Sequence, residues 1–325
     1  VYTGGARGRT TPTGTTPPLE PTSRGRQQST NWSIVYTGGP RGRTTPTGTH
    51  STNGIPTSTV PTTKDPTMRH TFPTSEPVHL DVTLRAGHLT VTASAALTEA
   101  VVDIEPTSAG DDAALAVTFD GHALAIRDTR QHRGLRRCRA DRAVTVTVPD
   151  GSRARLRTGS ADIDIRGTFG ALAMATGSGD IQVQRVDGPS EGRSGSGDIR
   201  VVRAVAPLAL GAGSGDLVVD AAAAPLHLKV GSGDATVHTA SGDLHVTTGS
   251  GDVRLASVSG GTVRVRAGSG DVSIGVPLGI PVYAEVDAGG GVTNRLTPRG
   301  RPEPGQDHVR LRVHTGAGSL RLSDA

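Results

Sequence analysis

The sequence predicts an all-β fold, a flattened β-solenoid built from 18-residue rungs of two strands each, with strand-rich caps. Three observations predict it. A Gly-Ser-Gly-Asp unit recurs at a fixed interval, aliphatic residues alternate after that unit, and aromatic residues make up only 2% of the chain. Fixed self-similarity is the signature of a repeat architecture. With so few large rings, the core must consist of aligned Val, Ile, Leu and Ala side chains.

The recurring unit reads GSAD once and GSGD thereafter, and successive units lie 18 residues apart five times and then 19. Gly and Asp both favour turns. We therefore expect the glycines to supply positive φ and each Asp to cap its own turn through the backbone. The predicted structural turn residues are Asp162, Asp180, Asp198, Asp216, Asp234, Asp252 and Asp271.

Aliphatic columns follow each Asp at the first and third positions, and a further pair fills the second half of each unit. Two strands per rung with inward side chains at alternate positions account for this pattern. Stacked rungs would lie about 4.8 Å apart and the two walls about 10 Å apart. An antiparallel meander fits the period less well but stays open. Ser190 and Gly192 replace the aliphatic pair in one rung and predict a local weak spot.

The chain divides into four segments on this basis. Period-2 alternation predicts strands near 79–84, 88–92, 100–104, 114–119, 122–127 and 143–148. We expect an N-terminal β cap over 68–150, the solenoid over 151–275 and a C-terminal β cap over 276–325. Pro277 and Pro281 suit an edge strand in that last segment.

Residues 1–67 are rich in Thr, Pro, Gly, Ser and Arg and lack hydrophobic periodicity. Such a segment cannot bury enough apolar surface to offset its ordering entropy, so we expect a disordered tail. It contains a duplication, VYTGGARGRTTPTGT and VYTGGPRGRTTPTGT. Either the tail is a functional arm, or an over-long gene model precedes a true start at Met68. We favour the second interpretation.

The charge distribution argues against nucleic-acid binding. Residues 1–67 carry seven basic and two acidic residues, whereas the remainder carries 27 basic and 28 acidic ones. A nucleic-acid interface needs its basic excess on the folded part. The Arg-rich segment 127–142, which includes the single cysteine Cys138, is expected to be a solvated loop, with a phosphate site or a reactive thiol as the alternatives.

Metal and catalytic motifs are expected to be absent. Calcium-binding β-rolls place Gly two, four and five positions before Asp, whereas here Gly lies one and three positions before it. His227 and His245 share one outward column, but zinc normally needs three or four ligands. The outward column two positions after each Asp shows no carboxylate pair for glycoside cleavage. We therefore expect no catalytic residue, no cofactor and no metal.

The GSGD-hydrophobic-x-hydrophobic units resemble the bacterial putative-adhesin family of β-strand-repeat proteins, a domain of unknown function. The opening strand at 77–82 and the stretch RPEPGQDHVRLRV at 301–313 share this resemblance, which covers about residues 70–325. It implies a non-catalytic structural or interaction protein whose partner is an unknown protein or glycan. Some relatives resemble cell-envelope stress proteins, so an envelope scaffold is one alternative. A carbohydrate-active enzyme on a β-solenoid is the other.

Location and assembly follow from simpler signals. No apolar run approaches the roughly 18 residues of a membrane span, and no secretory signal is visible. We therefore expect a cytoplasmic protein without a membrane span, while a cell-surface role stays open. Long regular walls could also self-associate through an uncapped sheet edge.

Overall fold

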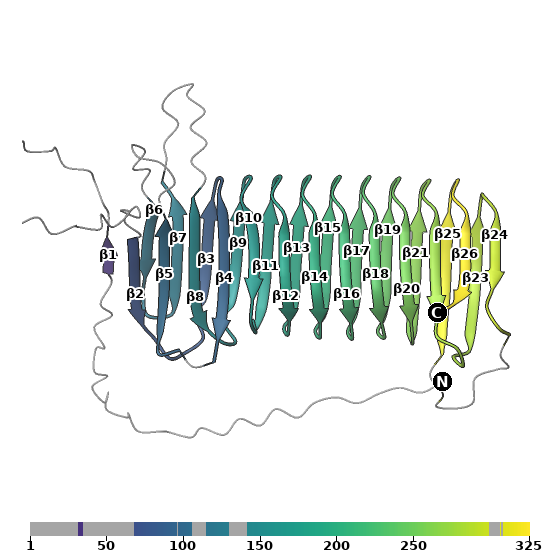
Figure 1. The fold of residues 1–325 in the computed structure, drawn as a ribbon, viewed down its shortest axis with the longest axis horizontal. Coiled ribbons are helices and arrows are strands. Elements are labelled where there is room, and N and C mark those ends of the chain that lie inside the picture. The colour runs from purple at the N-terminus through teal and green to yellow at the C-terminus, as the bar shows by residue number, and fades with distance from the viewer. Residues whose placement is uncertain are drawn as a thin grey trace, which may run out of the picture.

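The computed structural model describes residues 32–34, 68–95, 97–105, 115–129, 142–298, 306 and 308–325. Every regular element in this part of the chain is a β-strand. The strands line up side by side in one long, flattened stack of two sheets with 13 strands each (Figure 1). None of the described segments forms a helix long and apolar enough to cross a membrane.

The two sheets are called sheet A and sheet B, and their strands are given in spatial order. Sheet A contains β1 (Trp32–Ile34), β6 (Leu115–Phe119), β7 (Ala123–Asp128), β3 (His79–Leu84), β9 (Arg153–Thr158), β11 (Ala171–Thr176), β13 (Ser190–Ser194), β15 (Leu208–Ala212), β17 (Leu226–Val230), β19 (Leu244–Thr248), β21 (Gly261–Ala267), β25 (Val309–Thr315) and β23 (Val282–Ala288). Sheet B contains β2 (Met68–Pro73), β5 (Glu99–Glu105), β8 (Ala143–Pro149), β4 (His88–Ser94), β10 (Asp162–Arg166), β12 (Ile181–Val186), β14 (Ile199–Ala204), β16 (Leu217–Ala222), β18 (Ala235–Ala240), β20 (Val253–Val258), β22 (Val272–Val276), β26 (Leu320–Asp324) and β24 (Val292–Arg295).

Each repeat unit contributes one strand to each sheet. From β9 and β10 to β21 and β22, neighbouring rungs pair in parallel in both sheets. Parallel neighbours joined through the opposite wall define a β-solenoid, so the predicted fold is confirmed. The antiparallel meander is wrong for this segment.

The predicted aliphatic columns form the core. Ile163 pairs with Ile181 and Ile181 with Ile199, and this column continues to Val272. The column that begins at Ile165 runs beside it in the same register. Their side chains are buried, as are the Leu and Val pairs of sheet A that face them. The aliphatic interior is therefore continuous from rung to rung, as the sequence predicts.

Ser190 lies in the rung that the sequence predicts to be weak, and its hydroxyl replaces a missing ladder acceptor. The Leu172 N–H donates to Ser190 Oγ at 3.0 Å, and the Ser190 hydroxyl donates to the Gly188 carbonyl at 2.8 Å. In the next two rungs the equivalent N–H groups of Ser190 and Leu208 donate to proline carbonyls instead. Ser190, the polar residue in an otherwise aliphatic column, is therefore hydrogen-bonded as both donor and acceptor.

Ser190→Ala is expected to lower the free energy of unfolding by about 1–2 kcal/mol, because it leaves the buried Leu172 N–H without an acceptor. Urea denaturation followed by circular dichroism measures this change. Ser196→Ala, in an exposed turn, is the control and should change stability by less than about 0.5 kcal/mol. Equal effects of the two variants would contradict the hydrogen-bonding role of Ser190.

The glycines of the GSGD turns act differently from the prediction. None of them has positive φ, so that expectation is wrong. Instead, a Cβ added at Gly251 would lie 1.7 Å from the Gly233 carbonyl oxygen, and one at Gly215 would lie 2.1 Å from that of Gly197. The backbones of stacked turns approach too closely for any side chain, which is why glycine recurs. Positive φ among the described glycines occurs at Gly87, Gly121, Gly151, Gly167, Gly261 and Gly279.

At the N-terminal end the stack continues without a break into the predicted cap. β3 pairs in parallel with β9, and β4 pairs in parallel with β10, although residues 95–152 lie between β4 and β9 in the sequence. That inserted segment supplies β5 to β8. Among the described strands, antiparallel pairing occurs only there and at β1 and β2. The six strands predicted in this region are confirmed within a few residues. The boundary at 150/151 stays a prediction, since strands from both sides share both sheets.

Several predictions fall mostly outside the described residues. Of the tail 1–67, only Trp32–Ile34 is described, and it forms β1 antiparallel to β6. Of the Arg-rich segment 127–142, only 127–129 and 142 are described, so the loop, the phosphate-site and the Cys138 predictions are not covered.

At the C-terminal end the chain order is inverted. β25 and β26 pair with β21 and β22, and β23 and β24 then pair with the outer side of β25 and β26. The last strands of the chain, β25 and β26, thus lie between the rung of β21 and β22 and the rung of β23 and β24 (Figure 1). β23 follows directly after Pro281 and is the edge strand at the C-terminal end of sheet A, a position that tolerates proline.

Candidate functional site

A ladder of hydrogen bonds runs through the aspartates of the repeated turns. Asp162 Oδ1 accepts the backbone N–H of Asp180 at 3.0 Å, and each later Asp accepts from the next rung in the same way at 2.8 or 2.9 Å. Asp271 Oδ1 closes the series by accepting the Ser319 N–H at 2.7 Å. The expectation that each Asp caps its own turn is wrong. Because equivalent residues stack directly, each Asp caps the neighbouring rung.

The hydrogen bonds of the ladder offset the repulsion between neighbouring carboxylates. Neighbouring carboxylates about 4.8 Å apart cost about 1 kcal/mol in a water-like dielectric. A hydrogen bond to a charged acceptor contributes about 1.5–3 kcal/mol. The seven predicted turn aspartates therefore fit a structural role, and they also present a continuous row of acidic oxygens along one edge of the stack.

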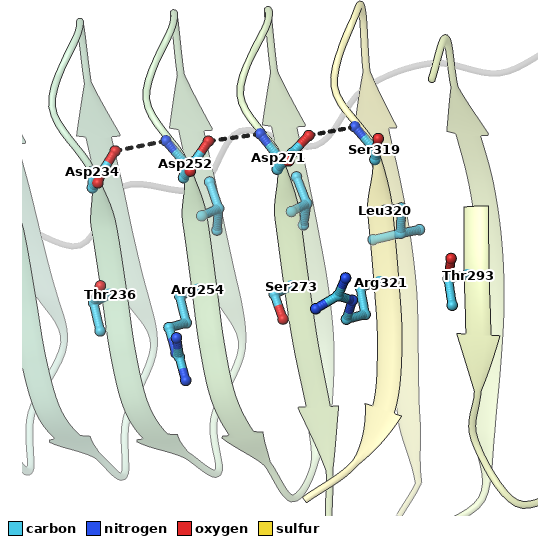
Figure 2. Close-up of a pocket in the computed structure, with 12 residues that line it drawn as sticks. Asp234, Thr236, Asp252, Arg254, Asp271, Ser273, Thr293, Ser319, Leu320 and Arg321 are labelled. Carbon is cyan, nitrogen blue, oxygen red and sulfur yellow. Dashed lines mark hydrogen bonds between the residues drawn. The ribbon is translucent and has the colours of Figure 1, made fainter. Parts of the chain in front are cut away.

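Beside the C-terminal half of this ladder the outer face of sheet B is hollowed (Figure 2). The groove has a volume of about 340 Å³. It crosses the outward column Thr236, Arg254, Ser273, Arg321 and Thr293, whose members pair in register on consecutive strands. Figure 2 shows Arg321 reaching toward Ser273, whereas Arg254 points away from the turns. The remaining lining residues are Asp234, Asp252, Val253, Asp271, Val272, Ser319 and Leu320.

The two arginines of the groove are available to a ligand. Arg200, in the same outward column, binds Asp220 at 2.8 Å. No comparable ion pair joins Arg254 or Arg321 to another residue in the described part of the chain. Arg forks suit carboxylate, sulfate and phosphate groups, and serine and threonine hydroxyls can complete such a site. The arrangement can therefore bind a polar, partly anionic ligand.

The sequence predicts one outward column that lines this groove, but not the groove itself. It places Thr236, Arg254 and Ser273 in one outward column, which the register confirms. It misses Arg321 and Thr293, which lie outside the repeat and reach the column only because β26 and β24 extend sheet B. The alternation LRL at 320–322 marks a strand, but not its neighbour.

Metal ligands do not cluster in the described residues: no three His, Cys, Asp or Glu side chains come together as a metal ion would require. His227 and His245 do lie side by side, with ring centroids 5.7 Å apart. The pKa of His245 is lowered, first by burial and then by the positive charges of His227, Arg266 and Arg264. The outer face of sheet A is therefore electropositive around β19.

His245 predicts a pH dependence of stability. Its folded-state pKa lies below the ordinary value of 6.5, so the unfolded chain takes up a proton that the folded chain resists. The contribution of His245 to the free energy of unfolding is therefore fully present above about pH 6.5, and it is lost as the pH falls below that value. His245→Gln is expected to reduce the loss of melting temperature between pH 7.5 and 5.

Scanning calorimetry at several pH values measures this difference. His88→Gln, at an exposed position at the start of β4, is the matched control and should change the slope less than His245→Gln does. A His245 variant with the same slope as the parent chain would show that this imidazole is not the group that resists protonation.

One further polar cluster was not predicted. Asp220 binds Arg200 at 2.8 Å and His238 Nδ1 at 3.2 Å on the outer face of sheet B. Arg200 and His238 are both about half exposed. Within the described residues no Ser, Thr or Cys is hydrogen-bonded to His238, so the cluster lacks the nucleophile of a catalytic triad.

Three similar solved structures come from bacteria. A putative cell adhesion protein from Clostridium sporogenes is 11% identical, with 80% of this chain and 100% of that chain covered and a TM-score of 0.23. A putative adhesin from Bacteroides fragilis is 14% identical, with 79% of this chain and 97% of that chain covered and a TM-score of 0.35. A putative lipid binding protein from Parabacteroides distasonis is 14% identical, with 78% of this chain and 96% of that chain covered and a TM-score of 0.34. No curated protein matches the chain.

The family assignment is more direct. The sequence model of the Toastrack DUF4097 family, a domain of unknown function, matches residues 78–291, which is well over half of the chain. The match begins one residue before β3 and ends between β23 and β24, so it spans the whole repeat region. The resemblance predicted from the GSGD units is confirmed, and the chain belongs to the Toastrack DUF4097 family.

Proposed function

We propose that the chain is a non-catalytic interaction module that binds a protein or a glycan on its flat outer walls. The observation that carries this proposal is the sheet B groove, where Arg254 and Arg321 flank Ser273 without ion-pair partners among the described residues. Rigid parallel rungs hold these side chains at fixed spacing. Such a surface suits recognition of a repetitive, polar partner.

A glycan array combined with a hydrolysis assay tests the proposal on the full chain. Binding without turnover is the expected result. Arg254→Gln/Arg321→Gln should weaken binding about tenfold or more, since the loss of about 1.4 kcal/mol changes an affinity tenfold. Arg166→Gln/Arg203→Gln, also exposed on sheet B, is the matched control and should bind like the parent chain.

The runner-up, a carbohydrate-active enzyme, makes the opposite prediction. Glycosidases need two carboxyl groups at a set separation across the scissile bond. The groove contains carboxylates only in the ladder, where backbone N–H groups occupy the Oδ1 atoms of Asp234, Asp252 and Asp271. Turnover of any arrayed glycan would favour the enzyme and contradict the proposal.

Self-association is a second candidate function, supported by the last rung. β23 and β24 each pair with one other described strand, and they leave Tyr283, Val286 and Val292 exposed by 59%, 37% and 51%. An edge strand with exposed apolar residues is a template for pairing, so a second copy of the chain is the proposed occupant. Light scattering should show a dimer that Val286→Lys abolishes. A monomer at all concentrations would contradict it.

Two expectations from the sequence stay predictions. The cytoplasmic location, the cell-surface role and the envelope scaffold differ in compartment, so fractionation of the native host would separate them. The division into tail, caps and solenoid is tested by limited proteolysis, which should cleave between residues 1 and 67 before it reaches the rungs.

A further inference from the structure

The outer face of sheet A carries an unbalanced group of cations, called here the cationic face. It consists of His227 and Lys229 on β17, His245 on β19, and Arg264 and Arg266 on β21. The register places His227, His245 and Arg264 in one row and Lys229, Thr247 and Arg266 in the next. None of the outward residues on these three strands is acidic.

The surroundings of the cationic face define its limits. On one side, β15 presents only Ala209 and Gly211 in the same rows. On the other side, Arg312 and His314 of β25 are bound by Glu285 and Asp287 of β23, both at 2.9 Å. The carboxylate of Asp243 lies at the turn before β19 and accepts the Thr262 N–H. The charges of the face itself therefore lack acidic partners among the described residues.

The spacing of these cations suits an extended polymer. Neighbouring rungs lie about 4.8 Å apart, and the two rows lie about 6.6 Å apart along the strands. The rung distance is close to the length of one pyranose unit in an extended polysaccharide. A chain running along the solenoid axis would thus meet basic side chains on successive rungs.

We propose that the cationic face binds an acidic polysaccharide that runs along the solenoid axis. The proposal rests on the proposed function as an interaction module, and it names a ligand class and a second wall. Arg264 and Arg266 would bind carboxylate or sulfate groups through their guanidinium forks, while Lys229 contributes a further charge and the two imidazoles offer ring nitrogens for hydrogen bonds.

The other polyanions fit the face less well. Binding to an anionic membrane surface is strengthened by apolar side chains that enter the bilayer, but the exposed large hydrophobic residues of the described chain all lie on other strands or turns. Single-stranded nucleic acid needs aromatic platforms on which bases stack, and the face carries no Phe, Tyr or Trp.

Binding should depend on pH. The groups facing His245 are His227 and Lys229 from β17 and Arg264 and Arg266 from β21, all basic. Burial lowers the pKa of His245 most, followed by the charges of His227, Arg266 and Arg264. A bound anion would offset that repulsion and raise the pKa of His245. Because the complex then holds a proton that the free chain resists, affinity is expected to increase as the pH falls below about 6.5.

Isothermal titration of the full chain with oligoalginate and with chondroitin sulfate tests the proposal, with dextran as the neutral polymer. Arg264→Gln/Arg266→Gln should weaken binding about tenfold and make its salt dependence shallower. Arg155→Gln/Arg157→Gln is the matched control, since these arginines occupy the same two outward rows on β9. Its binding should match that of the parent chain, and both variants should keep the parent melting temperature.

Three results would overturn the proposal. Binding of neither acidic polymer is one, and an equal loss in both double variants is another. The third is binding of an oligonucleotide or of phosphatidylserine vesicles in preference to the polysaccharides. If the Arg264/Arg266 variant still binds a ligand from the glycan array through the sheet B groove, the interaction function stands while the cationic face does not.

Discussion

Gly251→Ala is expected to lower the free energy of unfolding by about 3 kcal/mol, the range of severe backbone and packing changes. The new Cβ would lie 1.7 Å from the Gly233 carbonyl oxygen and 2.5 Å from its carbon. Both are backbone atoms, so no side-chain rotation can relieve the clash. The two turns would have to separate, which stretches the hydrogen bond from the Asp252 N–H to Asp234 Oδ1 at 2.8 Å.

Gly291→Ala is the matched control for this experiment. It makes the same chemical change, but its Cβ would meet nothing within 4 Å and its φ is not positive. Stability should stay the same or rise slightly, because alanine restricts the unfolded chain. Urea denaturation of both variants gives the comparison. If both lose the same stability, close stacking of the turns is not what requires glycine.

The repeat made most of the fold predictable. Because every rung repeats the same local choices, one column such as Ile163 to Val272 determines strand, face and register together. Side chains in β-strands alternate between faces, so a one-residue slip would have exposed the whole column. The 19-residue step is visible in the register as well, since Leu244 pairs with Val263.

The chain order at the C-terminal end could not be predicted. The alternation at 309–313 marks a strand, and so does that at 282–288, but periodicity does not say which one pairs with β21. β25 buries Val309, Leu311 and Val313 at the inner position, whereas β23 leaves its inward residues partly or fully exposed. The more aliphatic strand thus occupies the covered position, a choice made by tertiary packing.

The candidate sites were predictable only in part. The outward column His227, His245 and Arg264 can be derived from the repeat, and the structure confirms it. The column becomes a candidate anion-binding site only together with the next row, where Lys229 and Arg266 add charge. It also depends on the lack of acidic outward residues on β17, β19 and β21. The role of the aspartates was misjudged because a sequence does not distinguish a bond within a turn from one to the rung above.

Leu217→Ala, in the middle of the stack, is expected to lower the free energy of unfolding by about 3 kcal/mol or more. Leu217 is fully buried between Ile199 and Ala235 in the column of sheet B. Its truncation removes apolar contacts and leaves a cavity that rigid parallel backbones can close only in part. In a stack where each rung contacts its neighbours, the damage should also separate the array into two halves.

Hydrogen exchange can detect that separation. Amides of β14 and β18, on either side of the truncated rung, should exchange faster than those of β10, because the opening free energy is lost where neighbouring rungs no longer support each other. Leu278→Ala removes the same atoms from a side chain that is 65% exposed, and it should change stability by less than about 0.5 kcal/mol. A small, uniform effect of Leu217→Ala would mean that the aliphatic column does not hold the rungs together, since a packed core cannot lose a central leucine without cost.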